Sequence, residues 1–238
     1  MDLDWFEQRI GPYLPTCDDL GVSPVSGRLG CSLEGGGKRR IFAIGNYINQ
    51  RLLYPIHSWL MKVLAERAMD GTFNQTAPLK LWIGQRESYS YYLTAATDGW
   101  PLVMLFELMQ SLFDRSFASS VVNSELATNT FVVPFVKRKF SIVSFVAGQP
   151  LGYYSSWPLF TLSHHFVIWW AANQVYPGVR FNRYAVLGDD VLICDKNVAL
   201  VYASVLDRLG VTISVSKSLV SDTGCVEFAK RFLVDELI

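Results

Sequence analysis

The feature that most constrains the fold is a short acidic turn between two apolar runs. Gly188, Asp189 and Asp190 separate an apolar run at residues 184–187 from a second one at residues 191–194. Two short β-type runs joined through a glycine predict a hairpin that carries both carboxylates at its tip. Neighbouring carboxylates suit hard divalent cations, which are often shared with substrate phosphates in two-metal phosphoryl transfer. The alternative is an ordinary acidic turn, because glycine and aspartate are common turn residues.

The composition indicates a packed globular chain without a global preference for a polyanion. Half of the 238 residues are hydrophobic, which is too many for a disordered protein. The 21 basic and 21 acidic residues cancel, so contacts with nucleic acid must depend on local clusters. The four cysteines are widely spaced, and we expect reduced thiols without disulfide partners. No apolar stretch is long enough for a membrane span, and the start of the chain lacks a secretory or transit pattern.

Hydrophobic periodicity divides the chain into helices and strands in the order of an α+β fold. Residues 1–34 are expected to be irregular. Helices are predicted at about residues 50–68, 97–113, 157–173 and 197–209. Strands are predicted at residues 88–93, twice within 131–146, on both sides of the acidic turn, and at 212–215. This order predicts an antiparallel sheet backed by helices.

Local basic clusters offer possible contacts with phosphate. Lys38, Arg39 and Arg40 follow a glycine run, and backbone amides with these cations could cradle phosphates. The spacing is not that of a P-loop, and a solvated basic strand edge is the alternative. Two more clusters could grip a nucleic-acid backbone or merely form polar edges: Lys137, Arg138 and Lys139, and Lys230 with Arg231.

Other candidate residues lie around the acidic turn. Residues 148–156 form a glycine-containing loop that ends in two serines at a helix start. Such a site can bind a sugar hydroxyl or a phosphate, or the serines can simply cap the helix. His164 and His165 lie within an apolar helix and fit satisfied core histidines better than metal ligands. Lys217 could act as a general acid toward a leaving pyrophosphate, or be a surface lysine.

The order of these segments resembles the motif series of viral RNA-dependent RNA polymerases. The resemblance is most specific for the mitovirus family, capsidless RNA elements that replicate inside mitochondria, at residues 37–46, 70–75 and 148–165. It implies an α+β polymerase palm at residues 88–238, partial fingers at residues 35–90, and no thumb. The implied location is the mitochondrion, and the implied partners are a single-stranded RNA template and NTPs.

The resemblance also implies roles for individual residues. Asp189 and Asp190 would hold Mg²⁺ or Mn²⁺ ions, and Lys217 would be the proton donor. The nucleotide-binding residues would be Lys38, Arg39 and Arg40 at the triphosphate, and Asp98 and Ser156 at the ribose hydroxyl. The implied reaction is attack of a primer 3′-hydroxyl on the nucleotide α-phosphate.

One departure from the family pattern affects the expected activity. Six residues before Asp98, where the family carries a metal-binding aspartate, this chain has Tyr92. A phenol has a reference pKa of about 10, so it is neutral near pH 7 and cannot replace a carboxylate that bridges two cations. The chain is also shorter than the family's polymerases. We therefore interpret it as an inactive polymerase remnant, like the mitovirus-derived insertions of plant genomes. Weak polymerase activity through Asp189 and Asp190, and a non-catalytic RNA-binding module, are the alternatives.

Overall fold

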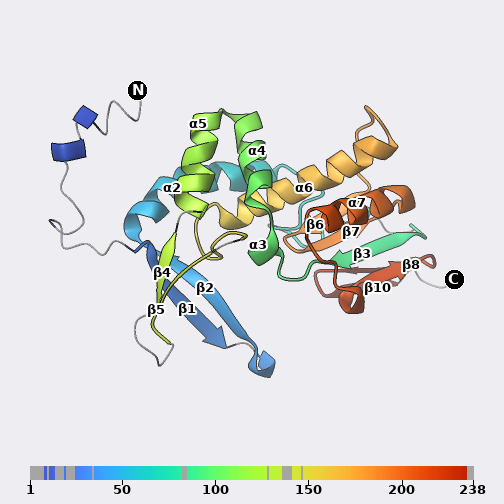
Figure 1. The fold of residues 1–238 in the computed structure, drawn as a ribbon. Helices are drawn as coiled ribbons and strands as arrows, with labels where there is room; N and C mark the ends of the chain where they lie inside the picture. The colour runs from blue at the N-terminus through green and yellow to red at the C-terminus, as the bar shows by residue number, and fades with distance from the viewer. Residues whose placement is uncertain are drawn as a thin grey trace.

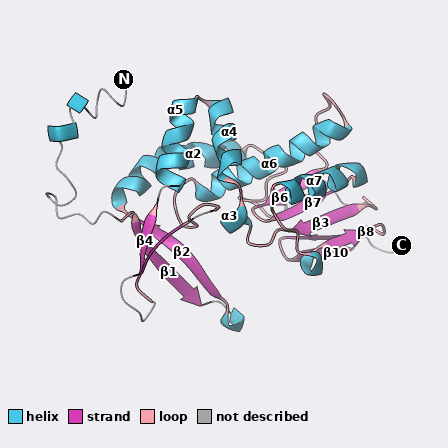
Figure 2. Cartoon of the chain, in the orientation of Figure 1, coloured by secondary structure: helices cyan, strands magenta, loops and turns pink. Residues whose placement is uncertain are grey.

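Two four-stranded sheets and the helices that link them make up the α+β fold of this chain (Figures 1 and 2). The computed structural model describes residues 8–9, 11–13, 19, 25–33, 35–81, 85–127, 129–135, 141–145 and 147–234. The α+β class and the antiparallel sheet predicted from the sequence are confirmed.

The first sheet combines an early hairpin with a later one. Its strands are β1 (Gly27–Leu33), β2 (Arg39–Gly45), β4 (Thr130–Val133) and β5 (Ser141–Ser144), in the order β2-β1-β4-β5. The β1–β2 and β4–β5 pairs are antiparallel, whereas β1 and β4 are parallel. This sheet therefore contains strands from both sides of the boundary between fingers and palm that was predicted near residue 90. The predicted basic cluster of Lys137, Arg138 and Lys139 lies between β4 and β5, outside the described residues.

The second sheet contains the predicted acidic hairpin. Its strands are β3 (Ser88–Tyr92), β6 (Tyr184–Leu187), β7 (Asp190–Ile193) and β8 (Leu219–Ser221), in the order β6-β7-β3-β8 with antiparallel pairs. Leu187 pairs with Asp190, so Gly188 and Asp189 form a two-residue turn. A separate antiparallel pair follows, formed by β9 (Cys225–Phe228) and β10 (Arg231–Val234).

The helices lie mostly where periodicity predicted them. They are α2 (Tyr47–Ala65), α3 (Ala96–Gly99), α4 (Leu102–Leu112), α5 (Arg115–Ala118), α6 (Ser156–Val175) and α7 (Lys196–Arg208). Four 3-10 segments are described, η1 (Gly11–Tyr13), η2 (Gly35–Gly37), η3 (Leu79–Leu81) and η5 (Val215–Lys217), and η4 (Ser119–Ala127) is a π-helix.

Two predicted elements were wrong, and residues 1–34, expected to be irregular, contain strand β1 because its residues pair with β2. The single helix predicted at residues 97–113 is divided into α3 and α4, because Pro101 keeps the preceding Trp100 in an extended conformation. The predicted strand at residues 212–215 is absent. Only Ile213 forms an isolated bridge, to Leu93, and the chain then turns into η5, which ends at Lys217.

Helix α6 is the central element of the core. It packs against α2, α4, α7 and β6, and most of its 20 residues are buried (Figure 1). A helix that is apolar on all sides is typical of such a position. Trp170 on this helix is 40% exposed, whereas Trp157 and Trp169 are half-buried.

Within the described ranges, no helix has the length and apolar character needed to cross a membrane. Cys31, Cys194 and Cys225 are free thiols, and Cys17 lies outside the described residues.

Candidate active site

Helix α6 packs directly against the acidic turn. Gly188 has a φ of +58°, and a Cβ at this position would lie 2.0 Å from the Trp157 ring. His164 Nδ1 lies 2.8 Å from the Gly188 carbonyl oxygen, and its Nε2 lies 2.6 Å from the Tyr202 hydroxyl. A carbonyl only accepts, so Nδ1 carries the proton and Nε2 accepts from the Tyr202 hydroxyl. Burial lowers the pKa of His164 to about 3, which keeps the ring in this neutral form.

His165 points to a different set of partners. Its Nε2 lies 3.0 Å from the Asp70 carboxylate, and its Nδ1 lies 2.9 Å from the Tyr184 hydroxyl. Both rings are fully buried and hydrogen-bonded at both nitrogens. The prediction that the two histidines are satisfied core residues is therefore confirmed.

Tyr92 lies directly beside the acidic turn. It pairs with Asp190 across β3 and β7, and the Leu93 amide donates to the Asp189 carbonyl at 3.0 Å. Lys217 Nζ lies 4.4 Å from the centre of the Tyr92 ring. Burial, followed by the charges of Asp189 and Asp190, raises the pKa of Tyr92 to about 12. The phenol is therefore neutral near pH 7.

The two carboxylates of the turn have different environments. Burial, and next the charges of Asp189 and Glu227, raise the pKa of Asp190 to about 7, although Lys230 and Lys217 oppose this shift. Asp190 is absent from the described lining of the cleft, whereas Asp189 lines it. Near neutral pH, a substantial fraction of Asp190 is consequently protonated, and the pair carries less than two negative charges.

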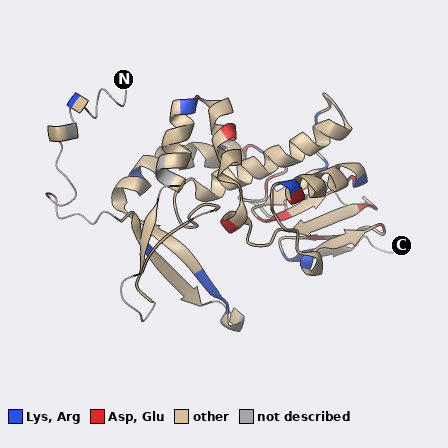
Figure 3. Ribbon diagram, in the orientation of Figure 1, with Lys and Arg blue, Asp and Glu red and all other residues tan. Residues whose placement is uncertain are grey.

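A cleft of about 690 Å³ joins the two sheets beside this turn. It brings together residues that are far apart in the sequence: Lys38, Arg39, Arg40, Tyr92, Asp98, Asp189 and Lys217. Basic residues mark the start of β2, and an acidic residue marks α3 (Figure 3). Most of the nucleotide-binding and catalytic residues predicted from the sequence therefore line one cleft.

Ser156 does not line this cleft. It is 1% exposed in the first turn of α6, and its hydroxyl has no hydrogen-bond partner among the described residues. The Ser155 hydroxyl donates to the Leu53 carbonyl at 3.1 Å, so neither serine side chain caps α6, and the predicted cap was wrong. The predicted RNA-binding residues Lys230 and Arg231 are exposed at the β9–β10 turn, away from the cleft lining.

Gln149 is a polar residue that the sequence did not single out. It is fully buried, and both polar atoms of its side chain lack partners among the described residues. Its backbone amide donates to the Thr97 carbonyl at 3.1 Å, which places it beside α3. A buried amide without partners is costly to the fold. Only its place within the 148–156 loop could have indicated it.

The model of the family described as "Mitovirus RNA-dependent RNA polymerase" matches residues 7–237. The chain belongs to this family. One relative of this mitovirus-type chain is an uncharacterized mitochondrial protein of Arabidopsis thaliana, 65% identical over 153 residues, or 63% of this chain and 75% of the relative. Another is the RNA-directed RNA polymerase of Cryphonectria parasitica mitovirus 1. It is 33% identical over 226 residues, which are 92% of this chain and 27% of that polymerase.

Solved structures support the polymerase fold of the mitovirus-type chain. An apo telomerase from Candida tropicalis has a TM-score of 0.67 at 10% identity, covering 90% of this chain and 54% of the telomerase. The RNA-dependent RNA polymerase of a human picobirnavirus has a TM-score of 0.64 at 16% identity, covering 89% of this chain and 43% of the polymerase. The chain thus spans about half the length of these structures.

Proposed function

We propose that this chain is a polymerase palm with partial fingers that binds nucleotide and RNA but does not transfer nucleotides. The observation that carries the proposal is the position of Tyr92, opposite Asp190 in the pairing of β3 with β7 and beside Asp189. This is the position at which we expect the family's first metal-binding aspartate. With its pKa raised to about 12, the phenol stays neutral and supplies no negative charge to a cation.

The side chains beside the turn do not fit a pair of divalent ions. Two-metal sites use carboxylates that bridge both ions and hold them near the substrate phosphates. Among the described residues, no group of three or more histidine, cysteine, aspartate or glutamate side chains could hold a metal ion. The neutral phenol of Tyr92 adds no charge beside Asp189, and the raised pKa of Asp190 reduces the charge of that carboxyl. Asp189 and Asp190 would be the ligands of any Mg²⁺ or Mn²⁺ that still binds.

The opposite wall of the cleft supports the binding part of the proposal. Lys38, Arg39 and Arg40 line the cavity and are exposed, so their charges can meet a triphosphate or an RNA phosphate. Asp98 lines the same cavity and would accept from a ribose hydroxyl. We leave Ser156 out of this role because it is buried. Lys217 would still be the proton donor, although its ammonium group is attracted to the Tyr92 ring.

The proposed partners are a single-stranded RNA template and NTPs, and the proposed location is the mitochondrion. The location is supported by the mitochondrial proteins of Arabidopsis thaliana that are similar to this chain. Residues 35–90 would correspond to partial fingers and residues 88–238 to the palm. Exposed Lys230 and Arg231 would contact the RNA backbone outside the cleft.

Nucleotide incorporation on a primed RNA template, with Mg²⁺ or Mn²⁺, tests the proposal. We expect no product from the native chain or from Tyr92→Phe, which removes the hydroxyl without adding a carboxylate. The Tyr92→Asp variant should bind Mn²⁺ more tightly than both, because it adds a third carboxylate beside Asp189 and Asp190. Calorimetry with Mn²⁺ measures this without requiring turnover. Product from the native chain, or equal Mn²⁺ affinity in all three proteins, would contradict the proposal.

A further inference from the structure

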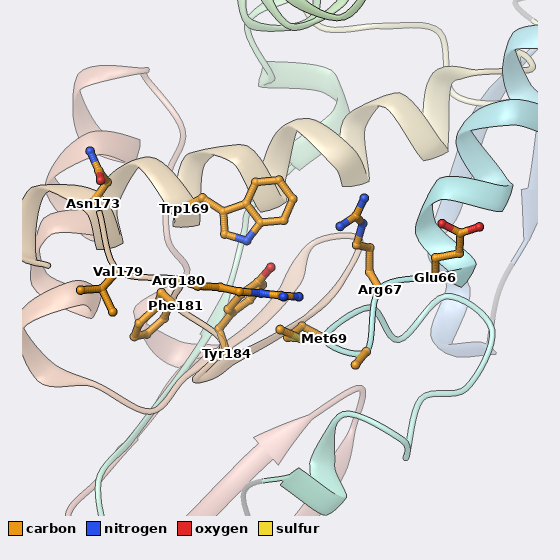
Figure 4. A pocket seen from close by; sticks show the side chains of 10 residues that line it. Glu66, Arg67, Met69, Trp169, Asn173, Val179, Arg180, Phe181 and Tyr184 are labelled. Atoms are coloured by element: carbon orange, nitrogen blue, oxygen red, sulfur yellow. The ribbon is translucent and has the colours of Figure 1, made fainter. Parts of the chain in front are cut away.

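A second pocket, of about 520 Å³, lies toward the C-terminal end of α6 (Figure 4). It is bounded by the end of α2, by α6, by the loop that precedes β6, and by the first residue of β6. It shares no lining residue with the cleft. Trp157, which lines the cleft, precedes Trp169, which lines this pocket, by about 18 Å along the helix axis. The volume is in the range of small-ligand sites.

Two arginines converge on this pocket. Arg67 follows α2 and Arg180 lies in the loop before β6, and Figure 4 shows both side chains at the same cavity. Among the described residues, neither forms an ion pair, whereas neighbouring Arg183 is paired with Asp195. Both arginines lie close enough to Tyr184 for their positive charges to lower the pKa of its hydroxyl, although burial raises this pKa by more. Glu66 also lines the pocket but pairs with neither arginine.

The aromatic wall of the pocket is held in place from behind. The ring of Trp169 lies against His165, with 5.7 Å between the ring centroids, and His165 Nδ1 lies 2.9 Å from the Tyr184 hydroxyl. In the neutral imidazole, Nε2 donates to the Asp70 carboxylate, so Nδ1 accepts from Tyr184. These hydrogen bonds hold His165 in place behind Trp169. A wall that is ordered before binding loses less entropy when a ligand arrives.

We propose that this Arg67–Arg180 pocket binds one nucleotide unit, with the phosphate between the two guanidinium groups and the base against Trp169. Guanidinium groups recognise phosphate through paired, charge-assisted hydrogen bonds. Aromatic side chains stack on any base, so the pocket would tolerate different sequences. The unit can be a free nucleoside monophosphate or one nucleotide of an RNA strand, because both present the same two groups. The pocket is independent of the cleft and of its proposed function.

Photocrosslinking to the full chain tests this site with two probes. The first is 4-thiouridine 5′-monophosphate, and the second is an oligouridylate that carries one 4-thiouridine. We expect crosslinks on the peptide that contains Trp169, reduced roughly tenfold in the double variant Arg67→Gln/Arg180→Gln. Both arginines are exposed, so this variant should fold, and circular dichroism checks that it does. Arg208→Gln, an exposed arginine on α7, is the control and should leave the crosslink unchanged.

The outcomes separate the pocket from the cleft. Crosslinks at Trp169 with the monophosphate identify a free nucleotide, and crosslinks only with the oligouridylate identify an RNA strand; both support the proposal. The variant Arg39→Gln/Arg40→Gln should weaken crosslinks in the cleft and spare those at Trp169. Crosslinks confined to cleft peptides, or a Trp169 crosslink that survives in the double arginine variant, would overturn the proposal.

Discussion

Asp190 places a half-buried carboxyl next to other acidic groups, and this should make the stability of the fold depend on pH. The folded chain holds the Asp190 proton with a pKa of about 7, against an ordinary value of 3.8. Between these values the folded state binds a proton that the unfolded state has released, so the free energy of unfolding falls as pH rises. His164 has the opposite effect, because its pKa is lowered from 6.5 to about 3.

Substituting Asp190→Asn isolates the first effect. We expect the variant to gain about 2 kcal/mol relative to the native chain between pH 4 and pH 7, less than the full shift would give because solvent reaches part of the carboxyl. Urea denaturation of both proteins across this range measures the difference. The exposed Asp207→Asn on α7 controls for the added amide. A difference for Asp190→Asn that stays flat with pH would contradict the raised pKa.

At the scale of elements, the acidic hairpin depends on its close contact with α6. Gly188 has a positive φ, and its Cα faces the Trp157 ring at a distance that leaves no space for a methyl group. Gly188→Ala should therefore lose about 2 kcal/mol or more of unfolding free energy, from both strain and overpacking. Denaturant unfolding followed by circular dichroism provides the measurement.

Gly210→Ala is the matched control for this substitution. Gly210 also has a positive φ, +73°, but an added Cβ would meet nothing within 4 Å. Its loss should be limited to the backbone term, about 1 kcal/mol. Equal losses at the two glycines would show that the Trp157 contact contributes nothing.

Elements set by local patterns were predictable, and those set by distant contacts were not. The hairpin around Gly188, helix α6 and helix α7 follow from apolar spacing and turn residues over short stretches. Near residue 213, by contrast, the chain's path depends on Leu93 and Tyr92, over a hundred positions earlier. The Ser155 hydroxyl likewise bonds to Leu53 instead of to its own helix, a choice that only the tertiary structure determines.

At the scale of the whole molecule the net charge is zero, so RNA binding must depend on the basic residues along one wall of the cleft. Replacing Lys38, Arg39 and Arg40 together by glutamine should reduce the magnitude of the slope of log K against log salt concentration by about 2. Each lost phosphate contact accounts for about 0.7 of this change. Titration of labelled single-stranded RNA at several salt concentrations, with EDTA present, measures the slope. We expect binding by the native chain to persist in EDTA, because the proposed contacts need no metal.

A second triple variant controls for the change in net charge. Lys62, Lys196 and Arg208 are exposed and lie outside the cleft lining. Replacing these three by glutamine should leave the slope nearly unchanged. If both triple variants lower it equally, RNA contacts the molecule without preference for the cleft.

The candidate site was predictable in its members but not in their orientation. The order of motifs identified Lys38, Asp98 and Asp189 as candidate site residues, and all three line one cleft in the structure. Whether Asp190 faces the cleft or Glu227 depends on the sheet register and on β9, which sequence spacing alone does not contain. The burial of Ser156 similarly results from packing around α6.

The pairing of Tyr92 with Asp190 has a genetic consequence. The backbone of Tyr92 is held by Ser214 and Ser218 and by the strand pairing, none of which involves the phenol. An exchange of this side chain therefore requires no change in the path of the chain. Tyrosine and aspartate codons differ only in their first base. The sheet thus still provides the backbone position at which the proposed carboxylate would lie. A single base substitution separates the present gene from one that encodes aspartate there.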